Sequence, residues 1–165
     1  MLHIVVSAWC NYFFRQNPDA IYIRNWNQRT PVLLVGDRVG CASMLSYFLQ
    51  VAPDTVEHTY DDGSTLLHSV ANIDIAKTIF KLKPQLIDVV DCQGNTPLHH
   101  ATCRDVALCL LECKPSLVYV KNSDGQTPLH YAESDVARAI LRFKPDLVDT
   151  DEHGCTVLHV AIKHV

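Results

Sequence analysis

The stretch Gly94-Asn95-Thr96-Pro97-Leu98-His99 decides how this chain folds, because close copies of it stand at three other places. The copies begin at Gly63, Gly125 and Gly154 and read Gly-Ser-Thr-Leu-Leu-His, Gly-Gln-Thr-Pro-Leu-His and Gly-Cys-Thr-Val-Leu-His. A block that recurs at intervals of about thirty residues is the sequence pattern of a stacked repeat architecture. We therefore expect an array of similar units rather than an ordinary compact domain.

The prolines give a second, independent measure of the repeat. Five of the eight prolines recur at spacings of 35, 31, 31 and 30 residues, and each of the five stands eleven or twelve residues before a threonine. These prolines are Pro18, Pro53, Pro84, Pro115 and Pro145, and the threonines are Thr30, Thr65, Thr96, Thr127 and Thr156. We expect a single array over residues 1–165. Its units are a partial repeat 1–24, repeats 25–60, 61–90, 91–121 and 122–150, and a partial repeat 151–165.

The repeat 91–121 shows the expected local structure of one unit. Gly94 supplies the left-handed backbone of a turn, a conformation that other residues resist. Thr96-Pro97 then starts a first helix, since threonine is a good helix cap and proline suits the first helical position. Asp105, like Asp74 and Asp135 in the neighbouring repeats, is placed to cap a second helix.

The second helix of each repeat has one apolar face. Three columns at helical spacing are apolar in every full copy: Ile75/Val106/Val136, Ile79/Leu110/Ile140 and Phe80/Leu111/Leu141. A Lys-Pro pair follows each time, at Lys83-Pro84, Lys114-Pro115 and Lys144-Pro145. The lysine is favourable near the negative helix end and the proline stops propagation, so the pair predicts where the helix ends.

These units resemble the ankyrin repeat, whose Thr-Pro-Leu-His-x-Ala signature stands here at Thr96–Ala101 and Thr127–Ala132. The resemblance covers essentially the whole chain and is strongest from Asp61 to Ala161. It is weaker before Asp61, where Gln28 replaces the turn glycine and Leu33 stands in the histidine column.

The resemblance implies an all-α fold, an ankyrin-repeat solenoid of stacked helix-turn-helix units with short hairpin-like turns. Three repeats are about 31 residues long rather than 33, because the link between the helices, as in 101–105, is short. We expect tight turns there. In the family, the histidines of the signature hydrogen-bond to the backbone of the adjacent turn, so a structural role is expected for His68, His99, His130 and His159.

The best candidate for a metal or redox site combines Cys103, Cys109 and Cys113 with His99 and His100. However, Cys109 and Cys113 stand in columns that other repeats fill with small or apolar residues, which favours a packing role. The seven cysteines follow no disulfide framework, so we expect reduced thiols. We assign no metal and no cofactor, and keep a metal- or redox-responsive array as an alternative.

Composition and motifs exclude several classes of function. The chain contains none of the motifs of serine hydrolases, dinucleotide-binding proteins or phosphate-binding loops, so we expect no catalytic residues and no enzyme activity. The net charge of -4, without a dense basic cluster, argues against nucleic-acid binding. The apolar stretches are too short for membrane insertion and no signal peptide is recognisable, so we expect a cytoplasmic or nuclear protein.

The columns that vary between repeats are the candidates for recognition. They lie around the turn and the first helix, which by family resemblance project along one concave edge, the usual binding face of such arrays. We expect a protein partner, of unknown identity, to bind there, with His100 and Tyr131 as the main contacts. The predicted partner-binding residues are Asp61, Asp62, Ser69, Gln93, Asn95, His100, Asp124, Gln126, Tyr131, Glu152 and His153.

The two ends of the array are unusually apolar for a solenoid, whose end repeats need polar outer faces. The chain opens with Ile4-Val5-Val6, Trp9 and Tyr12-Phe13-Phe14 and closes with 160–165, where no second helix follows. We expect that the ends dock on something, self-associate, or belong to a longer ankyrin array. An inhibitory regulator of a transcription or signalling protein is a further alternative to a general binding scaffold.

Overall fold

The fold is mostly helical, as predicted. The computed structural model describes residues 12–13, 15–36, 42–144, 150, 153–154 and 156 of the 165. Over these residues it has seven α-helices and four short 3-10 helices. Extended pairing in the same part of the chain is limited to two isolated bridges, Thr59 with Thr65 and Thr150 with Thr156.

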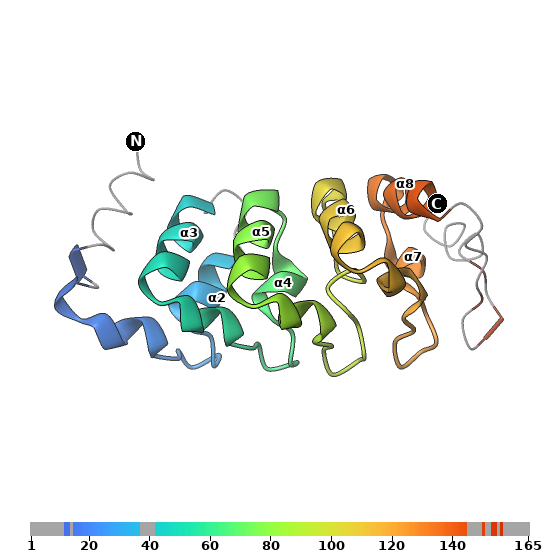
Figure 1. Ribbon diagram of the computed structural model, residues 1–165. Coiled ribbons are helices and arrows are strands. Elements are labelled where there is room, and N and C mark those ends of the chain that lie inside the picture. Colours follow the sequence, from blue (N-terminus) through green and yellow to red (C-terminus); the bar gives the residue numbers. More distant parts are fainter. Residues whose placement is uncertain are drawn as a thin grey trace.

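The longer helices lie side by side in one row, and the shorter ones lie beside that row (Figure 1). Helix α3 contacts α5, α5 contacts α6, and α6 contacts α8. The longer helices are α3 (Ala42–Val51), α5 (Ile73–Leu82), α6 (Arg104–Cys113) and α8 (Ser134–Phe143), and the shorter ones are α2 (Pro31–Gly36), α4 (Leu66–Ser69) and α7 (Pro128–Tyr131). The 3-10 helices are η1 (Pro18–Tyr22), η2 (Pro53–Glu57), η3 (Pro84–Asp88) and η4 (Pro115–Tyr119).

The core runs through the whole row as one cluster. Two of the three predicted apolar columns are buried in α5, α6 and α8, for example Ile75 and Ile79 in α5. The third column is not uniformly buried, since Leu111 is buried, Phe80 is half-buried and Leu141 is 40% exposed. The leucine before the histidine is also buried in the three blocks that the structure describes, with Leu67, Leu98 and Leu129 at most 2% exposed. Since neighbouring repeats share this core, no repeat buries its apolar face without the next one.

The Lys-Pro pairs end the ten-residue helices where the sequence predicts. Lys83, Lys114 and Lys144 are the C-cap residues of α5, α6 and α8. The prolines Pro84 and Pro115 then begin 3-10 helices. Two of these lysines also form ion pairs with the 3-10 helix of the preceding repeat, Lys83 with Glu57 at 2.7 Å and Lys114 with Asp88.

The predicted helix caps are wrong by two residues. Asp74, Asp105 and Asp135 lie inside the first turn of their helices and do not occupy the cap position. In α5 the cap is Asn72, whose side chain accepts hydrogen bonds from the amides of Asp74 and Ile75. The helices begin earlier because the links before them are so short. The negative charge of each aspartate still interacts favourably with the positive N-terminal end of its helix.

The first helix predicted at Thr96-Pro97 does not form. Residues 97–100 make a hydrogen-bonded turn, in which the His99 amide donates to the Thr96 carbonyl at 2.9 Å. The equivalent segments of the neighbouring repeats, α4 and α7, are helices of only one turn. The short link limits the first helix of a repeat to one turn, since α6 already begins at Arg104. It does not explain why 97–100 is a turn, because α4 has a link of the same length. The predicted tight connection is confirmed.

The apolar ends lie mostly outside the described residues. This applies to the segment 4–6, to Trp9 and to 157–165. Of the predicted apolar opening, Tyr12 and Phe13 are described, and their side chains are 68% and 39% exposed.

The turn glycines hold the backbone in the left-handed region. Gly63, Gly94, Gly125 and Gly154 have φ between 71° and 79°. Gln28, which replaces the glycine in the first described turn, has φ of 55°. Residues other than glycine are strained in this region, because their Cβ atom lies too close to the backbone. The first turn therefore keeps the shape of the others at an energetic cost.

We predict that Gly94→Ala destabilises the chain more than Gly63→Ala does. Both variants place a Cβ at positive φ, which costs about 1 kcal/mol. At Gly94 the new Cβ also lies 3.2 Å from the Ser123 amide nitrogen, whereas at Gly63 the nearest atom is 3.9 Å away. Urea unfolding followed by circular dichroism measures both free energies of unfolding. Equal losses would show that the crowding at Gly94 has no effect.

Candidate functional site

In the three repeated blocks that the structure describes, the threonine three residues before the histidine holds the histidine ring in place. The Thr96 amide donates to Nδ1 of His99 at 3.0 Å, and the Thr96 hydroxyl lies 2.9 Å from the same atom. Thr65 with His68 and Thr127 with His130 repeat this arrangement. Because Nδ1 accepts the amide proton, the ring carries its own proton on Nε2.

The same histidines join one repeat to the next. Nε2 of His68 lies 3.2 Å from the Asn95 carbonyl oxygen, and Nε2 of His99 lies 3.1 Å from the Gln126 carbonyl oxygen. Burial lowers the pKa of His99 to about 4 and also lowers that of His68. Both rings are therefore neutral at pH 7. The predicted structural role of these two histidines, with a bond to the adjacent turn, is confirmed.

A second set of contacts, which sequence reasoning missed, ties each hairpin-like turn to the residue nine positions later. The Tyr60 hydroxyl lies 3.3 Å from the Ser69 hydroxyl. Nε2 of His100 lies 2.8 Å from Oδ2 of Asp91. The two positions lie three residues before and six residues after the turn glycine. Polar residues that recur nine positions apart were therefore the signal in the sequence that could have predicted these contacts. In the next repeat, Asn122 donates to the Tyr131 hydroxyl at 3.0 Å.

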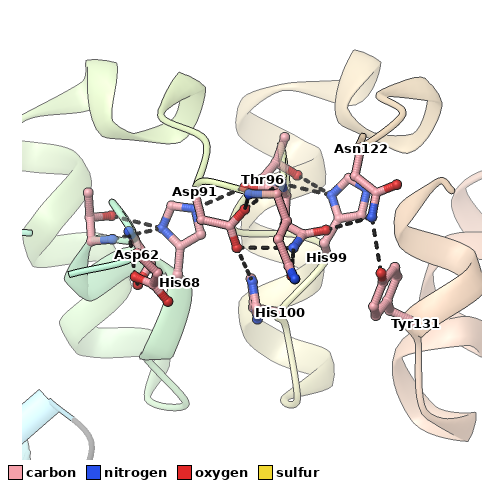
Figure 2. A network of polar contacts seen from close by, with 12 residues as sticks. Asp62, His68, Asp91, Thr96, His99, His100, Asn122 and Tyr131 are labelled. Carbon is pink, nitrogen blue, oxygen red and sulfur yellow. Dashed lines mark hydrogen bonds and ion pairs between the residues drawn. The ribbon is translucent and has the colours of Figure 1, made fainter. Parts of the chain in front are cut away.

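Asp91 is the most strongly held polar group in this part of the chain. Its Oδ1 accepts from the amides of Gln93 and Asn95, and its Oδ2 accepts from the Asn95 side chain and contacts His100 (Figure 2). Although burial by itself would raise the pKa of this carboxyl, the hydrogen bonds from Asn95, His100 and Gln93 lower it to about 2. Asn122 donates to Oδ1 of Asn95 at 2.8 Å and continues the network into the next repeat.

Backbone hydrogen bonds hold successive turns in register. The Cys92 amide donates to the Asp62 carbonyl at 2.7 Å, and the Ser123 amide donates to the Gln93 carbonyl at 2.9 Å. Among the described residues, no equivalent bond joins the turn at 25–30 to the turn at 60–65. There, the Arg24 guanidinium donates to the carbonyls of Gln28 and Thr59 instead.

An open hollow of about 320 Å³ lies at this first boundary between turns. Four of the predicted partner-binding residues converge on it although they come from two repeats. They are Asp61, Asp62, Ser69 and His100. The other residues that line it are Arg29, Tyr60, Ser64 and His68. The Arg29 guanidinium lies 5.3 Å from the centre of the Tyr60 ring.

Most of the other predicted binding residues lie on the following turns. Gln93, Asp124, Tyr131 and His153 are exposed, and Gln126 is half-buried. Asn95 is a correction, because its side chain is 1% exposed and bonded to Asp91 and Asn122, so no partner reaches it. Glu152 lies outside the described residues.

His100 and Tyr131, the residues predicted as main contacts, also serve the scaffold. His100 contacts Asp91 through Nε2, and the Tyr131 hydroxyl accepts a hydrogen bond from Asn122. Their side chains nevertheless remain accessible, with 42% of the His100 side chain and 46% of Tyr131 exposed. A partner would therefore meet rings that are already held in one orientation.

The cysteines differ from the prediction in one respect. Cys109 is buried, and burial together with the neighbouring Cys113 raises the pKa of its thiol. Cys113, predicted to pack in the core, is exposed because α6 ends there and turns its last residue to solvent. In the described part of the chain, no group of three metal-binding side chains comes together.

A scan against models of protein families gives no match, and a search of curated protein sequences gives none. The resemblance to the ankyrin repeat therefore depends on the repeated residues of this chain alone. None of the described helices has the length and apolar character needed to cross a membrane.

We predict that the chain loses stability as the pH falls from about 6.5 towards 4. In that range the unfolded chain binds a proton at His99 and the folded chain does not, since its pKa is about 4. The contribution of His99 to the free energy of unfolding is fully present above the unfolded pKa of 6.5, and about 3 kcal/mol of it is lost by pH 4. Urea unfolding at pH 7.5, 6.5, 5.5 and 5.0 measures the slope.

His99→Gln removes the titrating group and should make the slope between pH 6.5 and 5.0 shallower. Lys81→Gln, at an exposed position of α5, is the control that leaves every histidine in place, and it should leave the slope unchanged. A wild-type slope in the His99 variant would contradict the assignment.

Proposed function

We propose that this chain is an ankyrin-type repeat array that acts as a non-catalytic scaffold for a protein partner. The resemblance of the repeated block supports the family. The regular row of helices and the left-handed turn glycines agree with it. The binding face of the proposal is the set of turns together with the exposed rings of His100 and Tyr131.

The observation that carries the proposal is that the turns have a repeated, hydrogen-bonded backbone but expose side chains that differ from repeat to repeat. Backbone bonds from Cys92 to Asp62 and from Ser123 to Gln93 fix the turns relative to one another. Exposed and chemically different residues, such as Asp62, Gln93 and His153, occupy equivalent places on the turns. Such a surface offers many contacts without a deep, water-excluding site, which favours recognition over catalysis.

The mechanism of the scaffold is rigid presentation. The side chains of His100 and Tyr131 are already held by Asp91 and Asn122, so their ordering adds little to the cost of association. A surface that is preorganised in this way loses less conformational entropy when it binds. A partner that fits would therefore gain most of its contact energy as affinity.

Self-association is a second candidate, supported by exposed apolar residues near the start of the described chain. Trp26 is 88% exposed, Ile23 65% and Tyr12 68%. Neighbouring exposed apolar side chains of this size often mark interaction sites. A head-to-tail contact through them would build open chains unless the geometry closes a ring.

We predict that a partner captured from cell extract binds the turns and not the outer helices, by which we mean the ten-residue helices α5, α6 and α8. The immobilised chain is compared with the triple variant Asp124→Ala, Gln126→Ala and Tyr131→Ala. Asn122 keeps its bond to Asn95 in this variant, so the fold should persist, and far-ultraviolet circular dichroism verifies this. A partner identified by mass spectrometry should bind at least tenfold more weakly to the variant.

The matched control alters three exposed residues of the outer helices, Lys81→Ala, Arg104→Ala and Arg142→Ala. It should bind the same partner within twofold of the wild type. Equal loss in both variants, or loss in the control alone, would contradict the proposed face.

For the second candidate, we predict that Ile23→Gln with Trp26→Gln reduces any growth of the sedimenting species with protein concentration. The exposed Tyr119 provides the control as Tyr119→Gln, because it lies on η4 away from this segment. Sedimentation velocity measures all three proteins. Unchanged growth in the double variant, or a chain that stays monomeric at every concentration, would contradict self-association through these residues.

A further inference from the structure

The turn at 25–30 carries a tryptophan that sequence reasoning left off the binding face. The predicted columns begin at Asp61, because Gln28 replaces the glycine that marks each later turn. Trp26 stands two positions before Gln28, and Asp61 stands two positions before Gly63. Trp26 therefore belongs to the turn column of Asp61.

The hydrogen bonds of this turn confirm that register. The amides two and four residues after Asn25 both donate to its Oδ1 at 3.0 Å, and the Gln28 amide donates to its carbonyl at 2.9 Å. Asp91 holds its own turn by the same three bonds, from the residues two, four and three positions later. Trp26 is therefore a central residue of a turn that is fixed in the same way as the later ones.

The first turn borders predicted binding residues of the next two repeats. Arg29, at the end of this turn, lines the hollow of about 320 Å³ together with Asp61 and His100. Arg24 donates to the Thr59 carbonyl across the same boundary. A partner that covers Asp61 and His100 therefore reaches the first turn as well. Since the side chains at this boundary carry charges of both signs, net charge does not select that partner.

Trp26 differs from the other residues of its column in being large and apolar. It is 88% exposed, the highest value among the large apolar residues that the structure describes. Ile23, three residues earlier, is 65% exposed. Neighbouring exposed apolar side chains of this size often mark interaction sites. Tryptophan is also enriched among the side chains that contribute most to binding in protein interfaces.

We propose that Trp26 is the apolar anchor of the partner-binding face, and that its indole is buried in an apolar pocket of the protein that covers His100 and Tyr131. This inference rests on the proposed scaffold function and adds one contact of stated chemistry to it. The indole N–H only donates hydrogen bonds, so the pocket has aliphatic or aromatic walls and one acceptor at its rim. Because Asn25 already holds the turn, the backbone loses little conformational entropy when the ring is buried.

The first test places a photo-crosslinker at the position of the ring. The full chain with Trp26→p-benzoylphenylalanine is irradiated in cell extract, and crosslinked proteins are identified by mass spectrometry. The product should be the protein that the wild-type chain captures. It should be lost when the crosslinker is combined with Asp124→Ala, Gln126→Ala and Tyr131→Ala. The control carries the crosslinker in place of Lys81, which is exposed on α5, and should not give this product.

The second test measures affinities with the captured protein in purified form. Trp26→Ala should weaken binding at least tenfold, whereas Trp26→Phe, which keeps an apolar ring, should recover part of the loss. Tyr119→Ala, at an exposed position of η4, is the matched control and should change the affinity less than twofold. Far-ultraviolet circular dichroism verifies that each variant keeps the fold.

The outcomes separate the anchor from the scaffold function. An unchanged affinity of Trp26→Ala, with loss of the partner in the Tyr131 triple variant, would keep the scaffold and exclude the anchor. A crosslink from position 26 to a second copy of the chain, or to a protein that the triple variant still binds, would overturn the proposal as well. If the wild-type chain captures no protein, the scaffold function is contradicted and the anchor with it.

Discussion

The buried histidine of each block is the constraint on which the rest of the structure depends. Its two ring nitrogens serve different repeats: in His99, Nδ1 accepts from the Thr96 amide and Nε2 contacts the Gln126 carbonyl of the following turn. A buried ring nitrogen without its partner costs about 1–3 kcal/mol. Neighbouring repeats therefore stack stably in one register only. The apolar core supplies most of the free energy of packing, but it is the histidine that specifies how each repeat meets the next.

The sequence was sufficient for the period, the turn glycines, the ends of the long helices and the role of His68 and His99. It was insufficient where a local competition decides the outcome. The helix caps moved because short links forced the helices to begin earlier, and the same links limit the first helix of a repeat to one turn, as in α4 and α7. The link does not explain why 97–100 is a turn, since α4 has a link of the same length. Asn95 was misjudged because variation between repeats was taken as a sign of exposure. Its column holds a buried serine at 64 and a half-buried glutamine at 126, so burial there depends on neighbours that sequence alone does not place.

The pairs nine residues apart explain why scaffold and recognition cannot be assigned to separate columns. Tyr60 with Ser69, Asp91 with His100 and Asn122 with Tyr131 make the same connection with three chemistries. One member of each pair lies at the base of a turn and the other reaches the exposed face. A change at the face therefore needs a matching change at the base. The candidate hollow became visible only when the turns were placed side by side, since its walls come from residues far apart in the chain.

The missing backbone bond at the first turn boundary also has a mechanical consequence. At the later boundaries a bend of the array must stretch an amide-to-carbonyl bond as well as deform the core. At the first boundary the hydrogen bonds are made by side chains instead, from Arg24 to the carbonyls of Gln28 and Thr59 and between His58 and Thr30. The row is therefore not a uniform rod. It is most compliant between the first two described turns, so a bending load concentrates there, and the repeats that follow move together as one stiffer segment.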